Sequence, residues 1–295
     1  MINRLFNVFQ KLGIHVTPVH FYQPIPDTRE LREELWQSPS KLVGVDLNES
    51  GQLALLAEVS AAYGSEYGTF PDAATSCPYE FYHDQFNLPP VDAEVLYCMV
   101  RKFKPRRMIE IGSGLSTFVA AAAIRKNQEL LGHECHLTAI EPYPSPILQQ
   151  GFPGLAELLP ARVENVPMER FEALQENDIL FIDSSHVVRI GGDVLHEYLE
   201  IIPRLRPGVV IHAHDIFLPA HYPRQWIMEN HWFWTEQYLL QAFLACNRDF
   251  EVLWAGSHMH MMHGEKLTDA FPAYRRNKKW PGSFWMRRLP QSAQP

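Results

Sequence analysis

The chain has one dominant pattern, in which short apolar runs alternate with segments whose apolar residues recur at helical spacing, beginning near residue 91. Strands that alternate with helices are typical of a parallel sheet with helices packed on its faces. The pattern therefore predicts an α/β fold whose sheet is mostly parallel. Strands are predicted at residues 108–111, 135–140, 161–166, 178–183, 209–215, 250–254 and 283–287. Helices are predicted at residues 91–103, 118–124, 155–159, 192–205 and 222–246.

The first 90 residues lack this alternation. Residues 16–26 are rich in proline, so they should be extended rather than helical. The aromatic-rich residues 63–90 could cover a pocket or pack on the core. We therefore predict an N-terminal extension or cap at residues 1–90 and one domain at residues 91–295. Short helices are expected in the extension at residues 5–12, 29–36 and 53–63.

Composition narrows the class of protein. A hydrophobic content of 46% with 20% charged residues is that of a globular chain. The net charge of −8 argues against a nucleic-acid backbone as the main partner. The four cysteines form no C-x-x-C pair, which fits reduced thiols. No secretion signal or apolar run of about 18 residues is present, so we expect a cytoplasmic protein without a transmembrane segment.

Polar and acidic residues follow most of the predicted parallel strands. In an open parallel sheet, ligands bind at the carboxyl ends of the strands. A carboxylate there is poorly explained by packing, because a buried charge is costly unless it is paired. The sequence therefore predicts a ligand site at this edge. The candidate residues are Glu110, Glu141, Asn165, Val166, Asp183, Ser184, His186, His214 and Asp215.

The first predicted strand ends in a glycine turn that leads directly into a helix. The turn reads Glu110-x-Gly112-x-Gly114. Such a turn lets backbone N–H groups approach a ligand closely. A dinucleotide site would have a third glycine where Thr117 stands, so that fingerprint is broken. The next strand ends in a second acid, Glu141.

This arrangement resembles the class I S-adenosylmethionine-dependent methyltransferases over residues 91–254. The resemblance implies a Rossmann-like, mostly parallel seven-stranded sheet with helices on both faces, and S-adenosylmethionine as cofactor. In that family the glycine turn passes under the methionine moiety, and the acid that ends the second strand binds the ribose hydroxyls. The implied cofactor-binding residues are Glu110, Gly112, Ser113, Gly114, Thr117, Glu141, Asn165, Val166, Asp183 and Ser184.

Residues 109–117 and 179–186 look most like a bacterial branch of small-molecule O-methyltransferases. Some relatives hold Mg²⁺ with acids at the ends of the fourth and fifth strands, which makes Asp183 and Asp215 candidate metal ligands. Here His214 stands where an acid or amide is usual. Because Mg²⁺ prefers oxygen and histidine suits a softer ion, both a metal-bound and a metal-free site stay open.

Two histidines are candidates for a general base, the group that removes a proton from the methyl acceptor. His186 follows the fourth strand and His214 lies on the fifth, beside Asp183 and Asp215. An imidazole suits this role because its pKa lies near neutrality. We expect His186 or His214 to act as the base, with Asp215 orienting the ring. The histidines of residues 258–263 could resemble a metal tract, but alternation on a strand followed by a turn explains them as well, and we leave them out of the site.

The predicted function is transfer of a methyl group to a hydroxyl of a small molecule or saccharide. Three alternatives remain: N-methylation of a small substrate, an NAD(P)-dependent oxidoreductase, and a cofactor-binding scaffold without catalysis. Residues 63–90 and 225–243 could wall the acceptor pocket, and they could equally form core or a homodimer contact.

Overall fold

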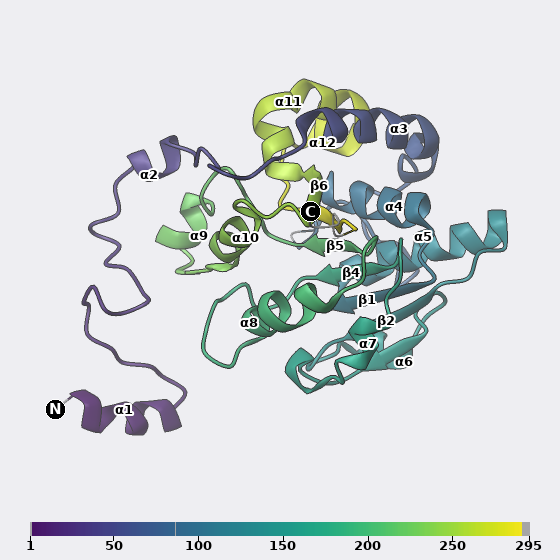
Figure 1. Cartoon of the computed structure of the whole chain (residues 1–295). Helices are drawn as coiled ribbons and strands as arrows, with labels where there is room; N and C mark the ends of the chain where they lie inside the picture. The colour runs from purple at the N-terminus through teal and green to yellow at the C-terminus, as the bar shows by residue number, and fades with distance from the viewer. Residues whose placement is uncertain (1, 86, 291–295) are drawn as a thin grey trace, which may run out of the picture. The chain divides into compact units, whose positions relative to one another are not determined.

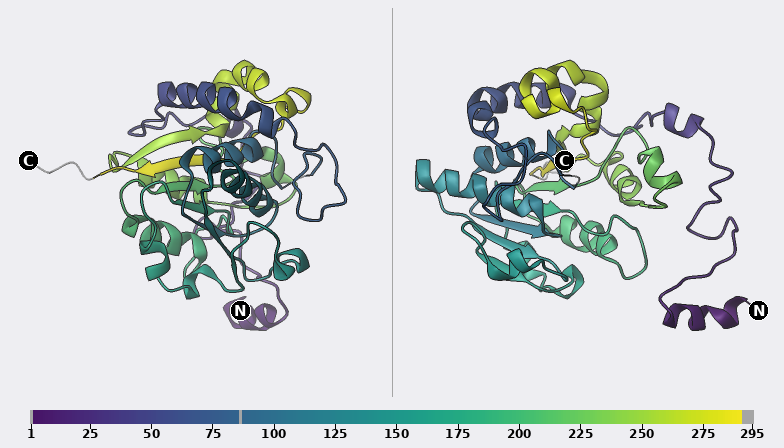
Figure 2. Two further views of the ribbon diagram at one scale, coloured as in Figure 1. Left: turned by 90° about the vertical axis from the view of Figure 1, so that its right-hand side faces the viewer. Right: turned by 180° about the vertical axis from the view of Figure 1, so that it is seen from behind.

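The computed structural model describes residues 2–85 and 87–290. The chain divides into two compact units. The smaller consists of Met1–Ser40 with Ala220–Phe233, and the larger of Lys41–Pro219 with Trp234–Pro295. Figure 1 follows the chain through both units, and Figure 2 gives two further views.

The smaller unit holds three short helices. They are α1 (Ile2–Lys11), α2 (Glu34–Gln37) and α9 (Arg224–Met228). Trp36 donates its indole N–H to the carbonyl of Tyr222 at 3.0 Å, and Arg224 pairs with Glu33 at 2.7 Å. These contacts join α2 to the start of α9. The expected helix at residues 29–36 is reduced to the single turn of α2.

The larger unit is built on one seven-stranded sheet in the order β3-β2-β1-β4-β5-β7-β6. β1 to β5 pair in parallel, and β7 runs antiparallel to β5 and β6. This confirms the predicted mostly parallel, Rossmann-like sheet. The strands are β1 (Arg107–Ile111), β2 (His136–Ile140), β3 (Glu157–Leu159), β4 (Ile179–Ile182), β5 (Val210–Ala213), β6 (Phe250–Ala255) and β7 (Phe284–Arg288).

Helices cover both faces of this sheet. Successive side chains of a strand point to opposite faces. Accordingly, Ile179 and Phe181 of β4 pack in one buried cluster, and Leu180 and Ile182 in the other. The first cluster includes side chains of α3 (Glu49–Tyr67), α4 (Asp92–Phe103), α5 (Leu115–Leu131), α11 (Gly256–Ala270) and α12 (Pro272–Arg276). The second includes side chains of α7 (Glu169–Glu172), α8 (Asp193–His196), the π-helix η2 (Glu197–Ile201) and α10 (Glu236–Leu244).

The helices on the first face are tied together by a buried arginine. Arg101 of α4 forms hydrogen bonds with Glu66 of α3 at 2.7 and 2.9 Å, and it also bonds Asn127 of α5. A charge this deeply buried is tolerated because it is paired.

The larger unit begins at Lys41, inside the segment predicted as an N-terminal cap. The division of the chain at residue 90 stays a prediction.

The region after β2 departs from the expectation. A helix was predicted at residues 155–159 and a strand at 161–166, whereas β3 is Glu157–Leu159 and Val163–Asn165 form a 3₁₀ helix, η1. The parallel pairing of β2 runs from Thr138 with Glu157 to Ile140 with Leu159. Val163 and Val166 are both buried, and their spacing of three residues matches a helical turn rather than a strand. A short helix, α6 (Pro146–Gln150), precedes β3.

Three further predictions about secondary structure differ from the observed elements. The long helix predicted at residues 222–246 is two helices, α9 and α10. The helix predicted at residues 192–205 is α8 followed by η2 and a 3₁₀ turn, η3 (Ile202–Arg204). Residues 258–263 belong to helix α11 rather than to a strand and turn. Across the described residues, no helix combines the length and the apolar character that crossing a bilayer requires.

Gly112 should be intolerant of any side chain. It has φ +76°, and a Cβ there would lie 1.8 Å from the carbonyl oxygen of Asp183. We expect Gly112→Ala to lower the free energy of unfolding by about 3–5 kcal/mol, since left-handed strain and overpacking add. Urea denaturation followed by circular dichroism measures the change.

Gly132 provides the matched control. It has φ +65° at the end of α5, and an added Cβ would meet no atom within 4 Å. Gly132→Ala should therefore cost only the strain, about 1–2 kcal/mol. Equal losses in the two variants would contradict the steric explanation.

Candidate active site

The loops after β1 and β4 touch through their backbones at the carboxyl edge of the sheet. The N–H of Asp183 donates to the carbonyl of Ile111 at 2.8 Å, and that of Gly112 donates to Ile140 at 2.9 Å. The close approach at Gly112 follows from the first of these bonds, because it holds Asp183 beside Ile111, the residue that precedes the glycine. The turn after β1 and the end of β4 are therefore adjacent at the carboxyl ends of the strands.

The turn leaves polar atoms without partners. Glu110 is fully buried and accepts a 2.6 Å hydrogen bond from Ser116 Oγ, and burial raises its pKa to about 8. Thr117 Oγ1 accepts from the N–H of Gly114 at 3.0 Å. Among the described residues, Glu110 Oε2 and Ser113 Oγ are buried without a hydrogen-bond partner. Since buried polar atoms are normally paired, these two atoms mark the turn as a place for a polar ligand.

Glu141, at the end of β2, reaches toward the same turn. Its carboxylate accepts from the N–H of Ser113 at 3.3 Å and from that of Tyr143 at 2.8 Å. The side chain therefore connects the loops after β1 and β2. Farther along, Asn165 at the end of η1 is exposed and Val166 is buried in the core.

A cluster of three carboxylates surrounds one imidazole beyond β4 and β5. We call Asp183, His186, Asp215 and Glu236 the carboxylate–histidine cluster. Nε2 of His186 lies 3.3 Å from Asp183 Oδ1 and 3.6 Å from Asp215 Oδ2. Its Nδ1 lies 2.8 Å from Oε2 of Glu236, which is completely buried. His186 itself is 5% exposed, whereas the side chains of Asp183 and Asp215 are 31% and 20% exposed, so the cluster is open to solvent on the side of Nε2.

The start of α10 holds His186 in place. His186 has φ +60°, in the left-handed region, and its carbonyl accepts from the N–H groups of Thr235 at 2.9 Å and Glu236 at 3.1 Å. The ring of Trp234 lies 4.4 Å from the imidazole, and Tyr198 donates to the second oxygen of Glu236 at 2.9 Å. A left-handed non-glycine residue is strained, so these contacts must stabilise it.

The sequence analysis missed Glu236. It follows Asp183 by more than fifty residues, sits in the first turn of a helix and belongs to no motif. Asp215 was predicted to orient the ring, whereas Glu236 makes the Nδ1 hydrogen bond and Asp215 lies on the Nε2 side. The only available sequence signal was an acid following Thr235 at a helix start, which ordinary helix capping also explains.

The cluster shifts the pKa values of its members. Burial opposes the charged form of His186, but hydrogen bonds to Asp183 and Glu236 outweigh it and hold the pKa well above its usual value. Burial also opposes the charge of Asp183, yet His214 and His186 lower its pKa. For Asp215 burial prevails and raises the pKa to about 6. The raised pKa favours the charged form of the His186 imidazole.

The two histidines of the fifth strand differ in their surroundings. His214 is 2% exposed, and its Nε2 lies 3.9 Å from Asp215. Burial opposes its charge, but the charges of Asp183, Asp215 and Asp92 raise its pKa. His212 stacks on Phe181 at 3.8 Å, and burial pushes its pKa well below the usual value. His212 thus packs in the core, while the three acids favour the charged form of His214.

The cluster could also hold a cation. Asp183, His186 and Asp215 each offer one ligand atom, and these atoms lie within 4.8 Å of one another. Two carboxylates with one imidazole form a donor set that suits a divalent transition ion. The two acids predicted as metal ligands are thus close together, with His186 as a third donor.

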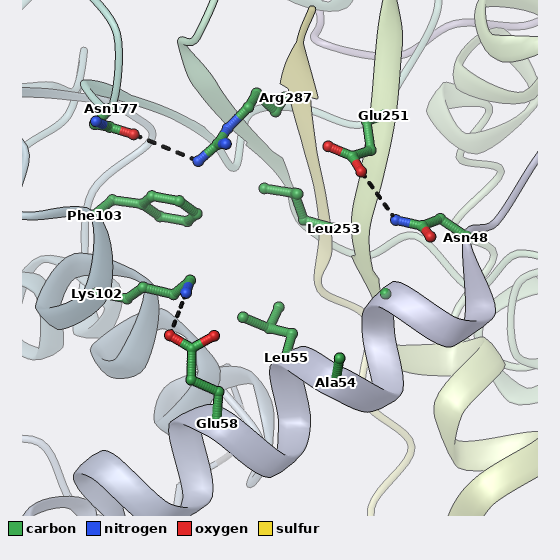
Figure 3. Close-up of a pocket in the computed structure, with 11 residues that line it drawn as sticks. Asn48, Ala54, Leu55, Glu58, Lys102, Phe103, Asn177, Glu251, Leu253 and Arg287 are labelled. Atoms are coloured by element: carbon green, nitrogen blue, oxygen red, sulfur yellow. Dashed lines mark hydrogen bonds and ion pairs between the residues drawn. The ribbon is translucent and has the colours of Figure 1, made fainter.

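A separate pocket lies at the other end of the parallel strands, near their amino ends. It has a volume of ≈ 360 Å³ and is lined by Leu55, Glu58, Phe103, Asn177 and Arg287, among others (Figure 3). Phe103 precedes β1 and Asn177 precedes β4, so this pocket lies where the parallel strands begin. It is not the predicted site.

The sequence matches known proteins over part of its length. A family model described as a methyltransferase domain matches residues 109–216, which include the turn after β1 and the cluster up to Asp215. An uncharacterized protein from Archaeoglobus fulgidus is 32% identical over 182 residues, covering 59% of this chain and 80% of that protein.

Solved structures of CmcI were also found. An apo structure aligns with TM-score 0.42 and 14% identity over 75% of this chain and 89% of that chain. A CmcI structure with Mg and SAM aligns with TM-score 0.37 and 14% identity, over 97% of this chain and 96% of the other.

Replacing Glu236 should release the proton held by His186. Glu236→Gln removes a negative charge that favours the imidazolium, so the pKa of His186 should fall toward its usual value. NMR titration of the His186 ring protons measures this shift. The exposed Glu200→Gln is the control and should leave the pKa of His186 unchanged.

The same variant should alter the pH dependence of stability. Because the folded-state pKa of His186 is raised, its favourable interactions stabilise the fold fully below pH 6.5 and are lost as the pH rises through the folded-state value. The stability difference between wild type and Glu236→Gln should therefore be largest below pH 6.5 and shrink at alkaline pH. A constant difference across this range would contradict the assignment.

Proposed function

We propose that this chain, whose residues 109–216 match the model of a methyltransferase domain, is a class I methyltransferase that transfers a methyl group from S-adenosylmethionine to a hydroxyl group of a small molecule or saccharide. The observation that carries this proposal is the carboxylate–histidine cluster, which lies against the glycine turn through the Gly112–Asp183 contact. It places a proton acceptor beside the loop expected to hold the methyl donor. The resemblance of residues 109–117 and 179–186 supports a place in the bacterial small-molecule branch.

S-adenosylmethionine, when bound, supplies a methyl group already activated on a sulfonium centre. The residues of this chain fit that ligand in two respects. Gly112 and Gly114 carry no side chain over the turn, and Ser113 Oγ and Glu110 Oε2 are unpaired polar atoms there, as counted over the described residues. We propose that the turn lies under the methionine moiety, with Thr117 bracing the start of α5.

The other cofactor contacts are assigned from their positions at the strand ends. Glu141 would accept hydrogen bonds from both ribose hydroxyls, a role that suits the two oxygens of a carboxylate. Asn165 and Val166 would flank the adenine, and Asp183 and Ser184 would lie near the methionine amino group. Ser184 Oγ already donates to Glu197 at 3.0 Å, so its backbone is the freer part for a ligand.

His186 is the proposed general base. Glu236 binds its Nδ1, so Nε2 is the nitrogen left to accept the proton of the acceptor hydroxyl. His186 must be neutral to do so, and its raised pKa predicts that the basic form increases toward alkaline pH. Asp183 and Asp215 would stabilise the imidazolium formed by this transfer. His214, buried and close to Asp215, would modulate the charge of both acids.

A divalent cation is a second use for the same atoms. Asp183 and Asp215 would be its ligands, with His186 as a nitrogen donor. A cation there would displace the proton from Nε2, since ligand and proton compete for one lone pair. His214 would then be the remaining candidate base. Loss of turnover on treatment with a chelator would favour this arrangement over the metal-free one.

The alternative functions make different demands. An NAD(P)-dependent oxidoreductase would be expected to have a third glycine at position 117. This chain has Thr117 there, and its hydroxyl accepts a hydrogen bond from the turn. N-methylation would need no base for an amine that is already neutral, so His186 would then be dispensable. A silent scaffold would bind the cofactor and transfer nothing. A cytoplasmic location and a homodimer remain predictions.

Glu141 provides the test of cofactor binding. Glu141→Ala should weaken binding of S-adenosylmethionine by roughly 10- to 100-fold, the value of losing a charged hydrogen bond of about 1.5–3 kcal/mol. Isothermal titration calorimetry measures the affinity. Glu134→Ala, an exposed acid preceding the same strand, should bind as wild type. Failure of the wild-type protein to bind at millimolar concentration would reject the proposed function.

His186 provides the test of catalysis. His186→Gln should keep cofactor affinity within a few-fold while lowering methyl transfer by about 10²–10⁴, the usual contribution of a general base. Formation of S-adenosylhomocysteine with a panel of hydroxylated small molecules and saccharides measures turnover. His133→Gln, at a ring that contacts only a loop carbonyl outside the cluster, is the control. Unchanged turnover of a hydroxyl acceptor in His186→Gln would exclude the base role of His186 and leave His214 as the candidate base.

A further inference from the structure

A second group of potential ligands lies in the larger unit, where α3 and α11 pack side by side (Figures 1 and 2). It consists of Glu49, the first residue of α3, with His258 and His263 of α11. We call it the Glu–His–His cluster. It shares no residue with the carboxylate–histidine cluster, and the proposed methyl transfer makes no use of it.

The three side chains converge on one point. Nε2 of His263 lies 2.7 Å from Oε1 of Glu49, and Nε2 of His258 lies 3.9 Å from Oε2 of the same carboxylate. One ligand atom from each residue lies within 4.8 Å of the other two. A tetrahedral ion with bonds of about 2.0–2.1 Å needs ligand atoms roughly 3.3 Å apart. The observed separations bracket this value, so small side-chain rotations would complete the geometry.

A break in α11 makes this convergence possible. Residues five apart on a regular helix point about 140° away from each other. His263 has φ −135° and ψ 33°, outside the helical region, so α11 is kinked at that residue. The kink turns the ring of His263 toward Glu49 and His258. No proline stands within the helix, but Gly264 follows His263 and has no side chain to oppose the kink.

The neighbouring histidine shows that the arrangement is selective. His260 lies between the two ligands in sequence but bonds the hydroxyl of Tyr274 at 2.7 Å and stacks on Trp280 at 5.0 Å. It therefore points away from Glu49. Only two of the three histidines in this run contribute to the cluster.

His258 carries an unsatisfied nitrogen. The residue is 9% exposed, and its Nε2 is buried with no hydrogen-bond partner in the described part of the chain. An unpaired buried polar atom is costly, and a bound ion would remove that cost. Burial lowers the pKa of His258, which leaves the ring in the neutral form that binds metals. The side chain of Glu49 is 51% exposed and keeps the cluster open to solvent.

We propose that Glu49, His258 and His263 bind a divalent transition-metal ion of the zinc class. Two imidazole nitrogens and one carboxylate oxygen are zinc ligands, whereas Mg²⁺ and Ca²⁺ prefer oxygen alone. Water would occupy the fourth position on the exposed side of Glu49. The ion would link the first turn of α3 to α11 and so stabilise the packing of these helices.

Zinc titration of the full-length protein tests the proposal. The wild type should bind ZnCl₂ in isothermal titration calorimetry, and Glu49→Gln and His263→Ala should each weaken this binding at least tenfold. His136→Ala is the matched control, because His136 also faces a glutamate, Glu157, at 3.7 Å, but the two belong to no three-ligand group among the described residues. It should bind zinc as wild type. Zinc should also raise Tm more in the wild type and in His136→Ala than in His263→Ala.

A further variant distinguishes zinc binding at the Glu–His–His cluster from binding at the carboxylate–histidine cluster. Asp215→Asn removes an acid of the carboxylate–histidine cluster and should leave the zinc equivalent at Glu49 in place. Loss of all zinc binding in Asp215→Asn, or wild-type affinity in both Glu49→Gln and His263→Ala, would overturn the proposal. His258→Ala tests the buried ligand, and circular dichroism checks its fold. If it unfolds, the variants of the more exposed Glu49 and His263 decide the question.

Discussion

The contact between Gly112 and the carbonyl of Asp183 is the constraint on which the site depends. Parallel pairing of β1 with β4 brings the two strands to the same edge, and the N–H of Asp183 donates to Ile111. No side chain fits at residue 112 under this arrangement. The turn expected to hold a methyl donor and the cluster expected to move a proton are therefore adjacent because of backbone hydrogen bonds. Their relation does not rely on flexible side chains.

The larger unit buries charged side chains in two places, at Arg101 and at His186, and their surroundings differ. Arg101 is matched by Glu66 and Asn127, which leaves a paired charge joining three helices. His186 instead faces three carboxylates, and His214 is a second imidazole beside Asp215. A group of several interacting acids and bases can take up a proton, a cation or a polar substrate. The first arrangement is thus structural, and the second is suited to chemistry.

The outline of the fold and part of the site followed from local patterns. Apolar runs such as residues 179–182 form strands that are buried on both faces of the sheet. The acids that follow these strands lie close together because parallel strands end on the same side of the sheet. Residues 161–166 misled the same reasoning, since Val163 and Val166 are buried by a single helical turn rather than by a strand. The edge position of β3 explains this difference, because an edge strand with one partner is short and its pattern is weak.

By itself, the sequence determined the alternation of strands and helices, the glycine turn at Gly112 and the acids Glu141, Asp183 and Asp215, because each is a property of a short stretch of chain. Only the tertiary structure decided that Glu236 holds His186 and that a kink at His263 aims two rings at Glu49. These contacts join residues separated by 50 and 214 positions. Their partners are selected by packing of whole elements, for which no local pattern of residues carries a signal.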